Sequence, residues 1–480
     1  MLFNSIEFIL FLPIVFFLYW FVFKKRQVQN LFIVVASYIF YGWWDWRFLV
    51  LIAVTSCCSF FSGLLLKHYN SDERARKSVS GANIVLNLGI LFVFKYFNFF
   101  TDNFILLFRN LGFHLDVVTI NVILPVGISF YTFQALSYTI DVYRNKIAPT
   151  HDIVEFFAFI SFFPQLVAGP IERATSLLPQ FQREREFNYA DAVDGMRQML
   201  WGFLKKVLVA DNCAFYVNRY WDLYDSFSGI SLFALAVLFT IQIYCDFSGY
   251  SDIAIGCARL FGINLKRNFE FPYFSNNIPE FWRRWHISLM TWFRDYVYIP
   301  LGGSRCAKWK HYSNIIVVWS ISGLWHGANW TFVCWGLYHA FLLIIYNILG
   351  LTKSIHSSDG FRCGLKLIND ILKIGLTFFL VVFGWILFRS ENVIQAYRFI
   401  SRMFLTFFDC PHIMLEKQPL YIAAIMLLVE WLQREKQHAL QFPNVYPFTL
   451  RTIRWIVYIA ITVIVVCFRG QSQTFIYFQF

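Results

Sequence analysis

Charged residues are scarce in this sequence: Asp, Glu, Lys and Arg make up 15% of its 480 residues, whereas 58% are hydrophobic. A soluble protein of this length needs a much larger polar surface, so the composition excludes an ordinary soluble protein. The apolar residues form continuous runs without a period of two, which argues against a membrane β-barrel. Because helices satisfy their own backbone hydrogen bonds in lipid, we expect an all-α, polytopic integral membrane protein.

Several signatures of enzymes and metal proteins are also missing. The chain has no His-Glu-x-x-His, Gly-x-Ser-x-Gly, P-loop or cofactor-type Gly-x-Gly-x-x-Gly motif. It has no Cys-x-x-Cys pair, and its 10 cysteines lie mostly in apolar sequence, as small core residues do. A zinc site made by His286, His326 and His339 is the weaker alternative, because these histidines lack a short ligand spacing. We therefore expect no metal and no tightly bound cofactor.

The positive charges sit in short clusters between apolar runs. A net charge of +12 could indicate nucleic acid, but this distribution follows the positive-inside pattern of a membrane protein, so we expect no nucleic-acid partner. The first apolar run, 6–23, precedes the basic cluster 24–26 and lacks a cleavage site, so we interpret it as a retained span with an extracytoplasmic N-terminus.

The remaining apolar runs predict one membrane domain over 1–480. We expect N-terminal spans in 1–115, a catalytic core in 120–350 and C-terminal spans in 360–480, with 229–262 forming a pair of helices. The other expected spans are 31–44, 48–66, 82–100, 195–217, 313–331, 332–350, 366–388, 419–433 and 452–469, with a less certain one at 396–408.

Three segments depart from a simple spanning pattern. Pro125 and Gly127 should kink or start a helix in the hydroxyl-rich segment 124–144. The run 162–173 contains two prolines and a glycine, which predicts a broken or re-entrant segment. Residues 265–313 are too polar to span and combine Arg with Trp, which favours short in-plane or re-entrant helices on the cytoplasmic side.

Two carboxylates, Asp246 and Asp252, fall within an apolar run. A charged carboxylate at the centre of a bilayer costs about 2.5–3.5 kcal/mol on insertion scales. Both side chains should therefore be paired, neutral or exposed to water. They also support an alternative function, a transporter with these carboxylates along its pathway, although the chain shows no clear inverted repeat.

The stretch 319–330 places an imidazole and an amide in apolar sequence, where polar groups are by default suspected of function. The stretch falls within the expected span 313–331, so residues three or four apart share one helical face, and Gly323 and Gly327 allow close helix packing. The alternative is a packing seam with a hydrogen-bonded histidine. The residues of that face are Trp319, Ser322, Gly323, His326, Asn329 and Trp330.

A second imidazole, His286, follows Arg283 and Arg284 and lies between tryptophans. Two guanidinium groups beside indoles suit a phosphorylated, ring-bearing ligand such as a nucleotide or pantetheine phosphate. A belt at the lipid headgroups is an equally good interpretation of the same residues. We interpret His339 as structural.

These motifs together resemble the membrane-bound O-acyltransferase family. The resemblance lies in 124–144, 163–170, 242–252, 281–303, WHGANW at 325–330 with WGLYH at 335–339, and FIYFQF at 475–480. The sequence is most similar to the bacterial branch containing the alginate O-acetylation membrane subunit and, more distantly, to the teichoic-acid D-alanyl transfer protein. The resemblance implies a ring of roughly 11 to 13 transmembrane helices around a thin centre, with a funnel from each side.

The resemblance further implies that His326 is the essential histidine and that His286 occupies a second motif position. A neutral imidazole can accept a hydroxyl proton as the oxygen attacks a thioester, which contributes roughly 10²–10⁴ in rate. Asn329 would steady the imidazole or the developing oxyanion, with Trp325 and Trp330 beside it. An acyl-imidazole intermediate is the alternative mechanism.

We therefore expect an acyltransferase of a bacterial plasma membrane. It would carry acetyl or a similar acyl group from acetyl-CoA or another acyl thioester to alginate, another extracellular polysaccharide, a cell-wall polymer or a relay protein. The family implies an extracytoplasmic partner of the serine-hydrolase type, in addition to membrane lipids. The alternatives are D-alanyl transfer to teichoic acid and a non-enzymatic transporter or scaffold of a glycan-export complex.

Overall fold

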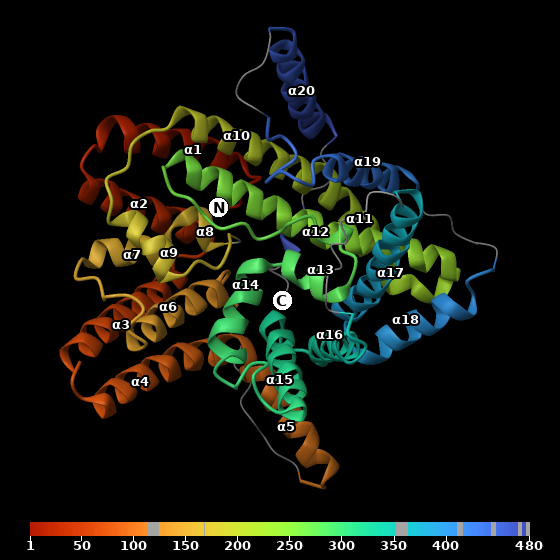
Figure 1. The fold of residues 1–480 in the computed structure, drawn as a ribbon, viewed down its shortest axis with the longest axis horizontal. Helices are drawn as coiled ribbons and strands as arrows, with labels where there is room; N and C mark the ends of the chain where they lie inside the picture. The colour runs from red at the N-terminus through yellow and green to blue at the C-terminus, as the bar shows by residue number, and fades with distance from the viewer. Residues whose placement is uncertain are drawn as a thin grey trace. The chain divides into compact units, whose positions relative to one another are not determined.

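The computed structural model describes residues 1–113, 124–167, 169–351, 363–409, 416–442, 448–468 and 473–476, and in these ranges the regular structure is helical throughout (Figure 1). Its contacts divide the chain into two compact units, which we call the first unit (Met1–Met196 and Ile253–Lys266) and the second unit (Arg197–Asp252 and Arg267–Phe480). Two of the three unit boundaries fall inside helices, α10 (Tyr189–Phe203) and α12 (Gly229–Leu260), and the third lies between Lys266 and Arg267. The single membrane domain expected from the sequence stays a prediction.

The first unit contains eleven further helical segments among its described residues. They are α1 (Ile6–Phe17), η1 (Leu18–Val22), α2 (Arg26–Gly42), α3 (Phe48–His68), α4 (Glu73–Leu91), η2 (Phe92–Tyr96), α5 (Phe97–Asn110), α6 (Ile128–Tyr143), α7 (Ile153–Ser161), α8 (Phe163–Leu166) and α9 (Ala174–Phe181). Helices α3, α4 and α6 pack against one another, and α2 packs against α7 and α8.

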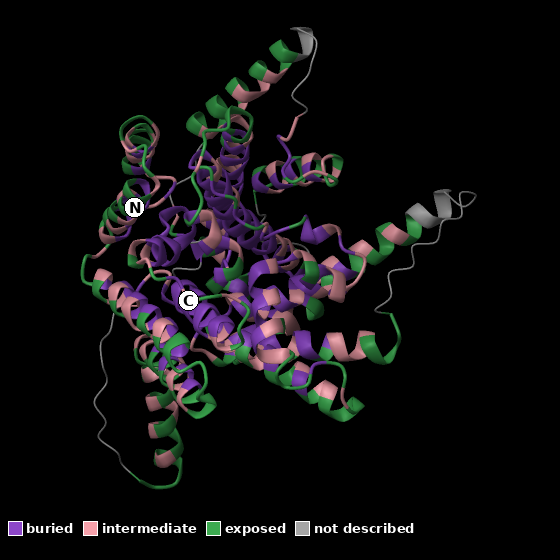
Figure 2. Ribbon diagram, turned by 60° about the vertical axis from the view of Figure 1, so that its left-hand side comes forward, coloured by how far each residue is buried: buried purple, intermediate pink, exposed green. Residues whose placement is uncertain are grey.

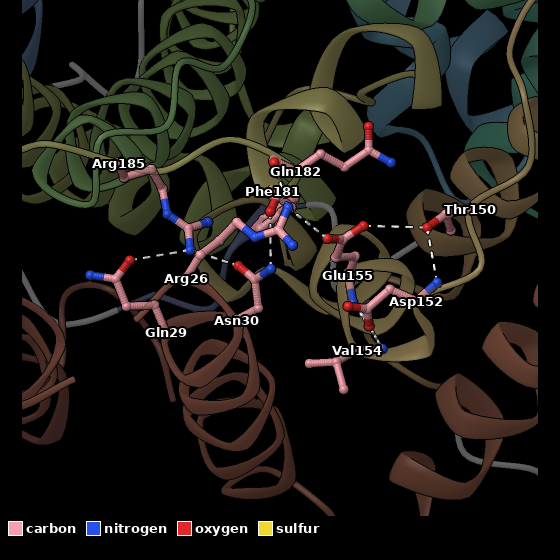
Figure 3. Close-up of polar contacts among 10 residues, drawn as sticks. All are labelled: Arg26, Gln29, Asn30, Thr150, Asp152, Val154, Glu155, Phe181, Gln182 and Arg185. Atoms are coloured by element: carbon pink, nitrogen blue, oxygen red, sulfur yellow. Dashed lines mark hydrogen bonds and ion pairs between the residues drawn. The ribbon is translucent and has the colours of Figure 1, made fainter. Parts of the chain in front are cut away.

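A polar network joins α2 to α7 and to the end of α9 within the first unit (Figure 3). The guanidinium group of Arg26 pairs with Glu155 at 3.1 Å, and Arg185 donates to Asn30 at 2.6 Å. Asn30 in turn donates to the carbonyl oxygen of Phe181 at 3.0 Å. Side chains on three elements thus satisfy one another where apolar packing alone would leave backbone oxygens buried without donors.

The second unit holds the remaining elements. They are η3 (Leu204–Ala210), α11 (Asp211–Tyr220), η4 (Trp221–Ser226), η5 (Pro272–Phe274), α13 (Ile278–Arg284), α14 (Ile287–Phe293), η6 (Arg294–Tyr298), α15 (Lys308–His326), α16 (Trp330–Ile348), α17 (Cys363–Arg389), α18 (Val393–Leu405), α19 (Gln418–Leu432) and α20 (Phe448–Cys467). Helix α16 packs against α13, α15, α17 and α18.

Glycines bring the backbones of α15 and α16 into direct contact. A Cβ atom added to Gly323 would lie 2.2 Å from the carbonyl oxygen of Phe332, and one added to Gly336 would lie 2.2 Å from that of Trp319. Both distances are far inside van der Waals contact, so neither position has room for a side chain. The packing role predicted for Gly323 is therefore confirmed, and its partner across the interface is Gly336.

Five of the described helices are long and apolar enough to cross a membrane, judged by length and composition: α3, α4 continued through α5, α12, α16 and α17. The expected pair of helices at 229–262 is wrong, because α12 is a single helix of 32 residues. No proline interrupts this helix. Helix α12 is mostly buried, whereas α5 and α20 carry exposed and intermediate residues (Figure 2). The predicted total of 11 to 13 spans stays a prediction.

The three irregular segments agree with their sequence. Gly127 has a φ of 74° and is the residue from which α6 starts, so the glycine allows a left-handed turn that other residues adopt at a cost. Helix α8 has only four residues and begins with Phe163 and Pro164, which confirms the broken segment. Between 265 and 313 the helices α13 and α14 have seven residues each, too short to span a bilayer.

Candidate functional site

His286 lies at the junction of α13 and α14 in the second unit. Its φ of 43° and ψ of 50° are left-handed, a conformation that costs a non-glycine residue roughly 1–3 kcal/mol. The segment 268–270 holds the strained turn through two backbone hydrogen bonds of 2.9 Å. Ile287 donates its N–H to the carbonyl oxygen of Asn268, and Glu270 donates to that of Arg284. The turn therefore fixes where the imidazole points.

The side chain of Asn268 anchors the His286 ring. Its Oδ1 atom lies 3.0 Å from His286 Nδ1 and also accepts from the backbone N–H (3.3 Å) and the hydroxyl (2.9 Å) of Ser288. Its Nδ2 atom donates to Ser251 on α12 at 3.3 Å. Burial lowers the pKa of His286 to about 3, so the ring is neutral at physiological pH. The role of Asn268 could not be predicted from the sequence, because a lone asparagine in a polar segment resembles any surface asparagine.

His326 is the last residue of α15, and its ring is surrounded by aromatic side chains. Trp335 of α16 and Phe388 of α17 contact the imidazole edge to face, with ring centroids 5.0 and 5.2 Å away. Trp325 contacts it at 4.9 Å. His326 is 4% exposed. Phe388 could not be predicted as a neighbour of His326, because it lies on a separate helix far along the chain.

Trp325 connects the two imidazoles. Its indole contacts the ring of His326 at 4.9 Å and the ring of His286 at 5.8 Å, in both cases edge to face. The indole itself is 3% exposed. The two histidines named from the sequence, 40 positions apart in the chain, thus share one buried neighbour, and the structure brings both motifs into one aromatic region of the second unit.

The expected single helical face over 319–330 is wrong. Helix α15 ends at His326, Gly327 is extended, and Asn329 is the N-cap of α16. The Oδ1 atom of Asn329 accepts from the N–H of Thr331 at 3.0 Å, and its Nδ2 atom donates to the carbonyl oxygen of Glu391 at 2.7 Å. A turn at Gly327 lets α16 pack back on α15. The amide of Asn329 thus caps α16, and the predicted role of Asn329 beside the imidazole or oxyanion stays a prediction.

Trp330, in the first turn of α16, is 53% exposed. It therefore differs from Trp325, although the sequence places both on the same motif.

The two arginines before His286 differ in their surroundings. Arg284 pairs with Glu280 one turn earlier in α13 at 2.7 Å, while Arg283 is exposed. The proposed phosphate binding by this pair stays a prediction, as does the headgroup alternative. Farther along, the adjacent Arg294 and Asp295 pair with each other at 2.7 Å.

Asp246 and Asp252 are both paired, as their position in an apolar run predicts. Asp246 lies 2.8 Å from Lys206, and Asp252 lies 2.6 Å from Lys205. Asp246 also accepts from the backbone N–H of Ile476 at 2.7 Å. The lysines come from η3, so the charges required by α12 are supplied from a segment 40 residues away. Two adjacent lysines in the apolar run 204–210 were the signal that the sequence analysis missed.

The same network contains two more carboxylates. Lys206 pairs with Asp211 at 2.7 Å, and Glu430 of α19 lies 3.8 Å from Lys205 and accepts from the hydroxyl of Tyr244 at 2.7 Å. Buried pairs with additional hydrogen bonds hold elements in one arrangement, because removing one partner leaves an uncompensated charge. The network thus fixes α12 against η3, α11 and α19.

His339 has the contacts of a structural residue. Its Nδ1 atom lies 3.3 Å from the indole nitrogen of Trp282, which donates to it, and its ring packs against Trp335. Across the ranges that the structure describes, no three His, Cys, Asp or Glu side chains are grouped so that they could hold a metal ion. The weaker zinc alternative therefore gains no support.

Comparisons with known proteins identify the family of the chain. Residues 38–352 match the model of MBOAT, the membrane-bound O-acyltransferase family. The chain is 39% identical over 405 residues to "Probable alginate O-acetylase AlgI" of Pseudomonas aeruginosa, covering 84% of this chain and 75% of that protein. It is 34% identical to the "Peptidoglycan O-acetyltransferase" of Helicobacter pylori, covering 84% and 80%. The "Teichoic acid D-alanyltransferase" of Bacillus subtilis is 31% identical over 56% of this chain and 70% of its own length.

The matched region includes both candidate histidines, the α15–α16 packing and the Asp246 and Asp252 pairs. It also extends over most of the chain. The chain is thus a multi-pass membrane protein that belongs to the membrane-bound O-acyltransferase family.

Proposed function

We propose that this protein transfers an acetyl group to hydroxyl groups of an extracellular polysaccharide, with His326 as the proton acceptor. The observation that carries the proposal is the buried imidazole at the end of α15, inside the region that matches the family. Similarity to one protein named as an alginate O-acetylase and to another named as a peptidoglycan O-acetyltransferase favours acetyl as the group and a glycan as the acceptor.

The chemistry requires a base and a dry, shaped site. The acceptor hydroxyl attacks the carbonyl carbon of an acyl thioester, for which acetyl-CoA is our first choice, and His326 takes the hydroxyl proton as the new C–O bond forms. The C–S bond then breaks, and the thiolate leaves and recovers a proton from the imidazolium. Aromatic rings around His326 exclude water, which favours transfer over hydrolysis.

The polarity of the chain in the membrane is part of the proposal. We place the protein in the plasma membrane of a bacterium with the N-terminus outside, because the basic cluster at 24–26 follows the first apolar run. The donor then enters from the cytoplasm and the acceptor from outside. The acceptor is either the polysaccharide itself or a relay residue on an extracytoplasmic partner of the serine-hydrolase type.

The test is a complementation experiment in the organism that carries the gene. Cells lacking the gene receive the wild-type chain, His326→Ala or the matched control His339→Asn, and alkali-released acetate is measured on purified extracellular glycans. We expect acetate with the wild type and the control and none with His326→Ala. If His326→Ala restored acetate at the wild-type level while present in the membrane in equal amount, the proposal would be wrong.

D-Alanyl transfer is the second candidate, because similarity to the teichoic acid D-alanyltransferase extends over 56% of the chain. The same alkali treatment releases D-alanine from its ester, so both products can be measured in one sample. Release of D-alanine that depends on His326, without release of acetate, would replace acetyl transfer by this candidate.

A further inference from the structure

The orientation of the Asn268 amide follows from its neighbours. A backbone N–H can only donate, and the N–H of Ser288 points at Oδ1 of Asn268 from 3.3 Å. The atom at that position must therefore be the oxygen. The other amide atom, Nδ2, faces the hydroxyl oxygen of Ser251 at 3.3 Å and donates to it, which agrees with this assignment.

An oxygen at Oδ1 determines which nitrogen of His286 carries the proton. Oδ1 lies 3.0 Å from Nδ1 of His286, and an amide oxygen only accepts. Nδ1 must therefore donate and hold the proton. In a neutral ring the other nitrogen, Nε2, then carries the lone pair.

We propose that Asn268 is a positioning residue that holds His286 as a neutral imidazole with its proton on Nδ1 and its lone pair on Nε2. His286 then presents a hydrogen-bond acceptor, instead of a positive charge, to the aromatic region that it shares with His326. The role of this lone pair in orienting the acceptor hydroxyl or a donor N–H rests on the proposed acyl transfer, whereas the tautomer itself does not.

The surroundings of His286 support a neutral ring. The aromatic neighbours are Phe247 of α12, at 4.7 Å, Phe269 at 6.4 Å and Trp325 at 5.8 Å, and none of them titrates in the range where imidazole does. The charged side chains on the elements that pack here are paired with one another, except Arg283, which is exposed. The pairs are Asp246 with Lys206, Asp252 with Lys205, Arg284 with Glu280, and Arg267 with Glu270.

The same contacts tie the tautomer to the fold. Asn268 holds the ring through its side chain and holds the left-handed turn through its carbonyl oxygen, which accepts from Ile287. Ser251 links the amide to α12. A residue that used only its backbone could support the turn, but it would leave the choice of tautomer open. An asparagine side chain makes that choice without adding charge.

The first test reads the tautomer directly. Full-length protein carrying ¹³C,¹⁵N-labelled histidine is placed in phosphatidylethanolamine–phosphatidylglycerol vesicles, and the His286 signals are identified as those lost in His286→Gln. We expect a neutral ring from pH 7.5 to 5.0, with the proton on the nitrogen bonded to Cγ, which is Nδ1. A proton on Nε2, or a cationic ring at pH 6, would overturn the proposal.

Substitutions at Asn268 then separate positioning from simple structural support. Asn268→Asp keeps an oxygen opposite Nδ1 and adds a negative charge, which raises the pKa of an imidazole by about 1–3 units. We expect its His286 signal to keep the proton on Nδ1 at pH 7.5 and to become partly cationic at pH 5.0. Asn268→Ala removes the acceptor, so we expect a mixture of both neutral tautomers. An unchanged tautomer in Asn268→Ala would contradict the assignment.

Activity gives an independent second readout, measured as glycan acetate per amount of membrane-embedded protein. We expect a loss of about 10- to 100-fold in Asn268→Ala, by analogy with the outer hydrogen-bond partners of functional histidines. Asn268→Asp should recover most of that loss at pH 7.5. Asn314→Ala is the matched control for Asn268→Ala, since Asn314 is a buried asparagine of α15 that donates to the carbonyl oxygen of Gly303; it should keep wild-type specific activity.

The two readouts fail separately. If the wild-type chain acetylates no glycan but shows the Nδ1 proton, the proposed function is wrong and the positioning by Asn268 holds. If acetylation occurs and equals the wild type in Asn268→Ala, with the tautomer unchanged, the positioning role is wrong and the function holds.

Discussion

His286 and His326 both contact the indole of Trp325, yet the groups that hold the two rings differ in type. An amide, a serine and a left-handed turn hold His286. Aromatic rings from α15, α16 and α17 surround His326 at the end of a regular helix. Hydrogen bonds fix a tautomer and a direction, whereas aromatic packing fixes a place and excludes water.

The difference indicates a division of labour. A base must change its protonation state during each turnover, and aromatic packing holds the imidazole in one place in both states. A ring that presents a constant lone pair benefits from an anchor such as Asn268. The comparison thus predicts that His326 titrates in the reaction and that His286 does not.

The strongest way to break this comparison is to remove each ring separately and then both. We expect His326→Ala to lower the acyl-transfer rate by roughly 10²–10⁴ and His286→Gln by a smaller factor. Because residues that act as one unit are not additive, the double variant should be no slower than His326→Ala by more than about threefold. Rates are measured as glycan acetate per amount of membrane-embedded protein. A larger loss with His286→Gln than with His326→Ala would reverse the assignment.

The second prediction concerns the buried pair that Lys206 makes with Asp246, on the helix that packs against His286. Asp246 precedes Phe247, whose ring contacts His286, so the pair with Lys206 holds the helix behind that imidazole. Lys206→Met leaves buried carboxylates unpaired and should lower the free energy of unfolding by about 3–5 kcal/mol. Adding Asp246→Asn should recover part of that loss. Thermal unfolding of the full chain in lipid discs measures both effects.

Lys146→Met is the control for this substitution. Lys146 is half exposed and lies 3.8 Å from Asp141, so its loss should cost no more than about 1 kcal/mol. Equal losses from Lys146→Met and Lys206→Met would mean that the buried network has no special part in holding α12.

The third prediction tests the aromatic side through its backbone contact. Gly323→Ala forces α15 away from α16, because the new Cβ would lie 2.2 Å from a backbone oxygen, and overpacking of this kind costs about 1–3 kcal/mol. The matched control is Gly375→Ala in α17, where a Cβ meets no atom within 4 Å. Its thermal midpoint should stay equal to the wild type or rise. A neutral result for Gly323→Ala would show that the helices separate freely.

The smallest expected effect is a pH dependence of stability. Burial holds the pKa of His286 near 3 in the folded protein, against an ordinary value of about 6.5 in the unfolded chain. The unfolded state therefore binds more protons below pH 6.5, and stability falls as the pH falls. Between pH 6.5 and 5.5 the loss from this group is about 1 kcal/mol. His286→Gln should remove that part of the acid sensitivity of thermal unfolding, and an unchanged sensitivity would refute it.

Local sequence determined much of this fold and part of the site. The cost of a carboxylate in lipid was enough to predict that Asp246 and Asp252 are paired, and Pro125 with Gly127 was enough to predict the start of α6. The partners could not be predicted, because Lys205 and Lys206 reach α12 only through tertiary packing. The end of α15 was missed for a different reason: a glycine is tolerated inside many helices, and only the return of α16 shows that Gly327 ends this one.

Asn268 illustrates the general difficulty. Its importance comes from three contacts with residues 17 to 20 positions away, and nothing in its immediate sequence distinguishes it from a surface asparagine. Aromatic neighbours of His326 raise the same problem, since Phe388 belongs to a helix far along the chain. Sequence thus located the two imidazoles, and tertiary structure was needed to show what holds each.

The break at Gly327 also places His326 at the carboxyl end of a 19-residue helix. The peptide dipoles of α15 add up to a partial negative charge there, carried by carbonyl groups that no later turn of the same helix can satisfy. Such a helix end stabilises a nearby cation by about 0.3–2 kcal/mol, depending on burial. In the proposed reaction the His326 imidazole becomes that cation when it takes the proton of the attacking hydroxyl, so the end of α15 would assist the transfer.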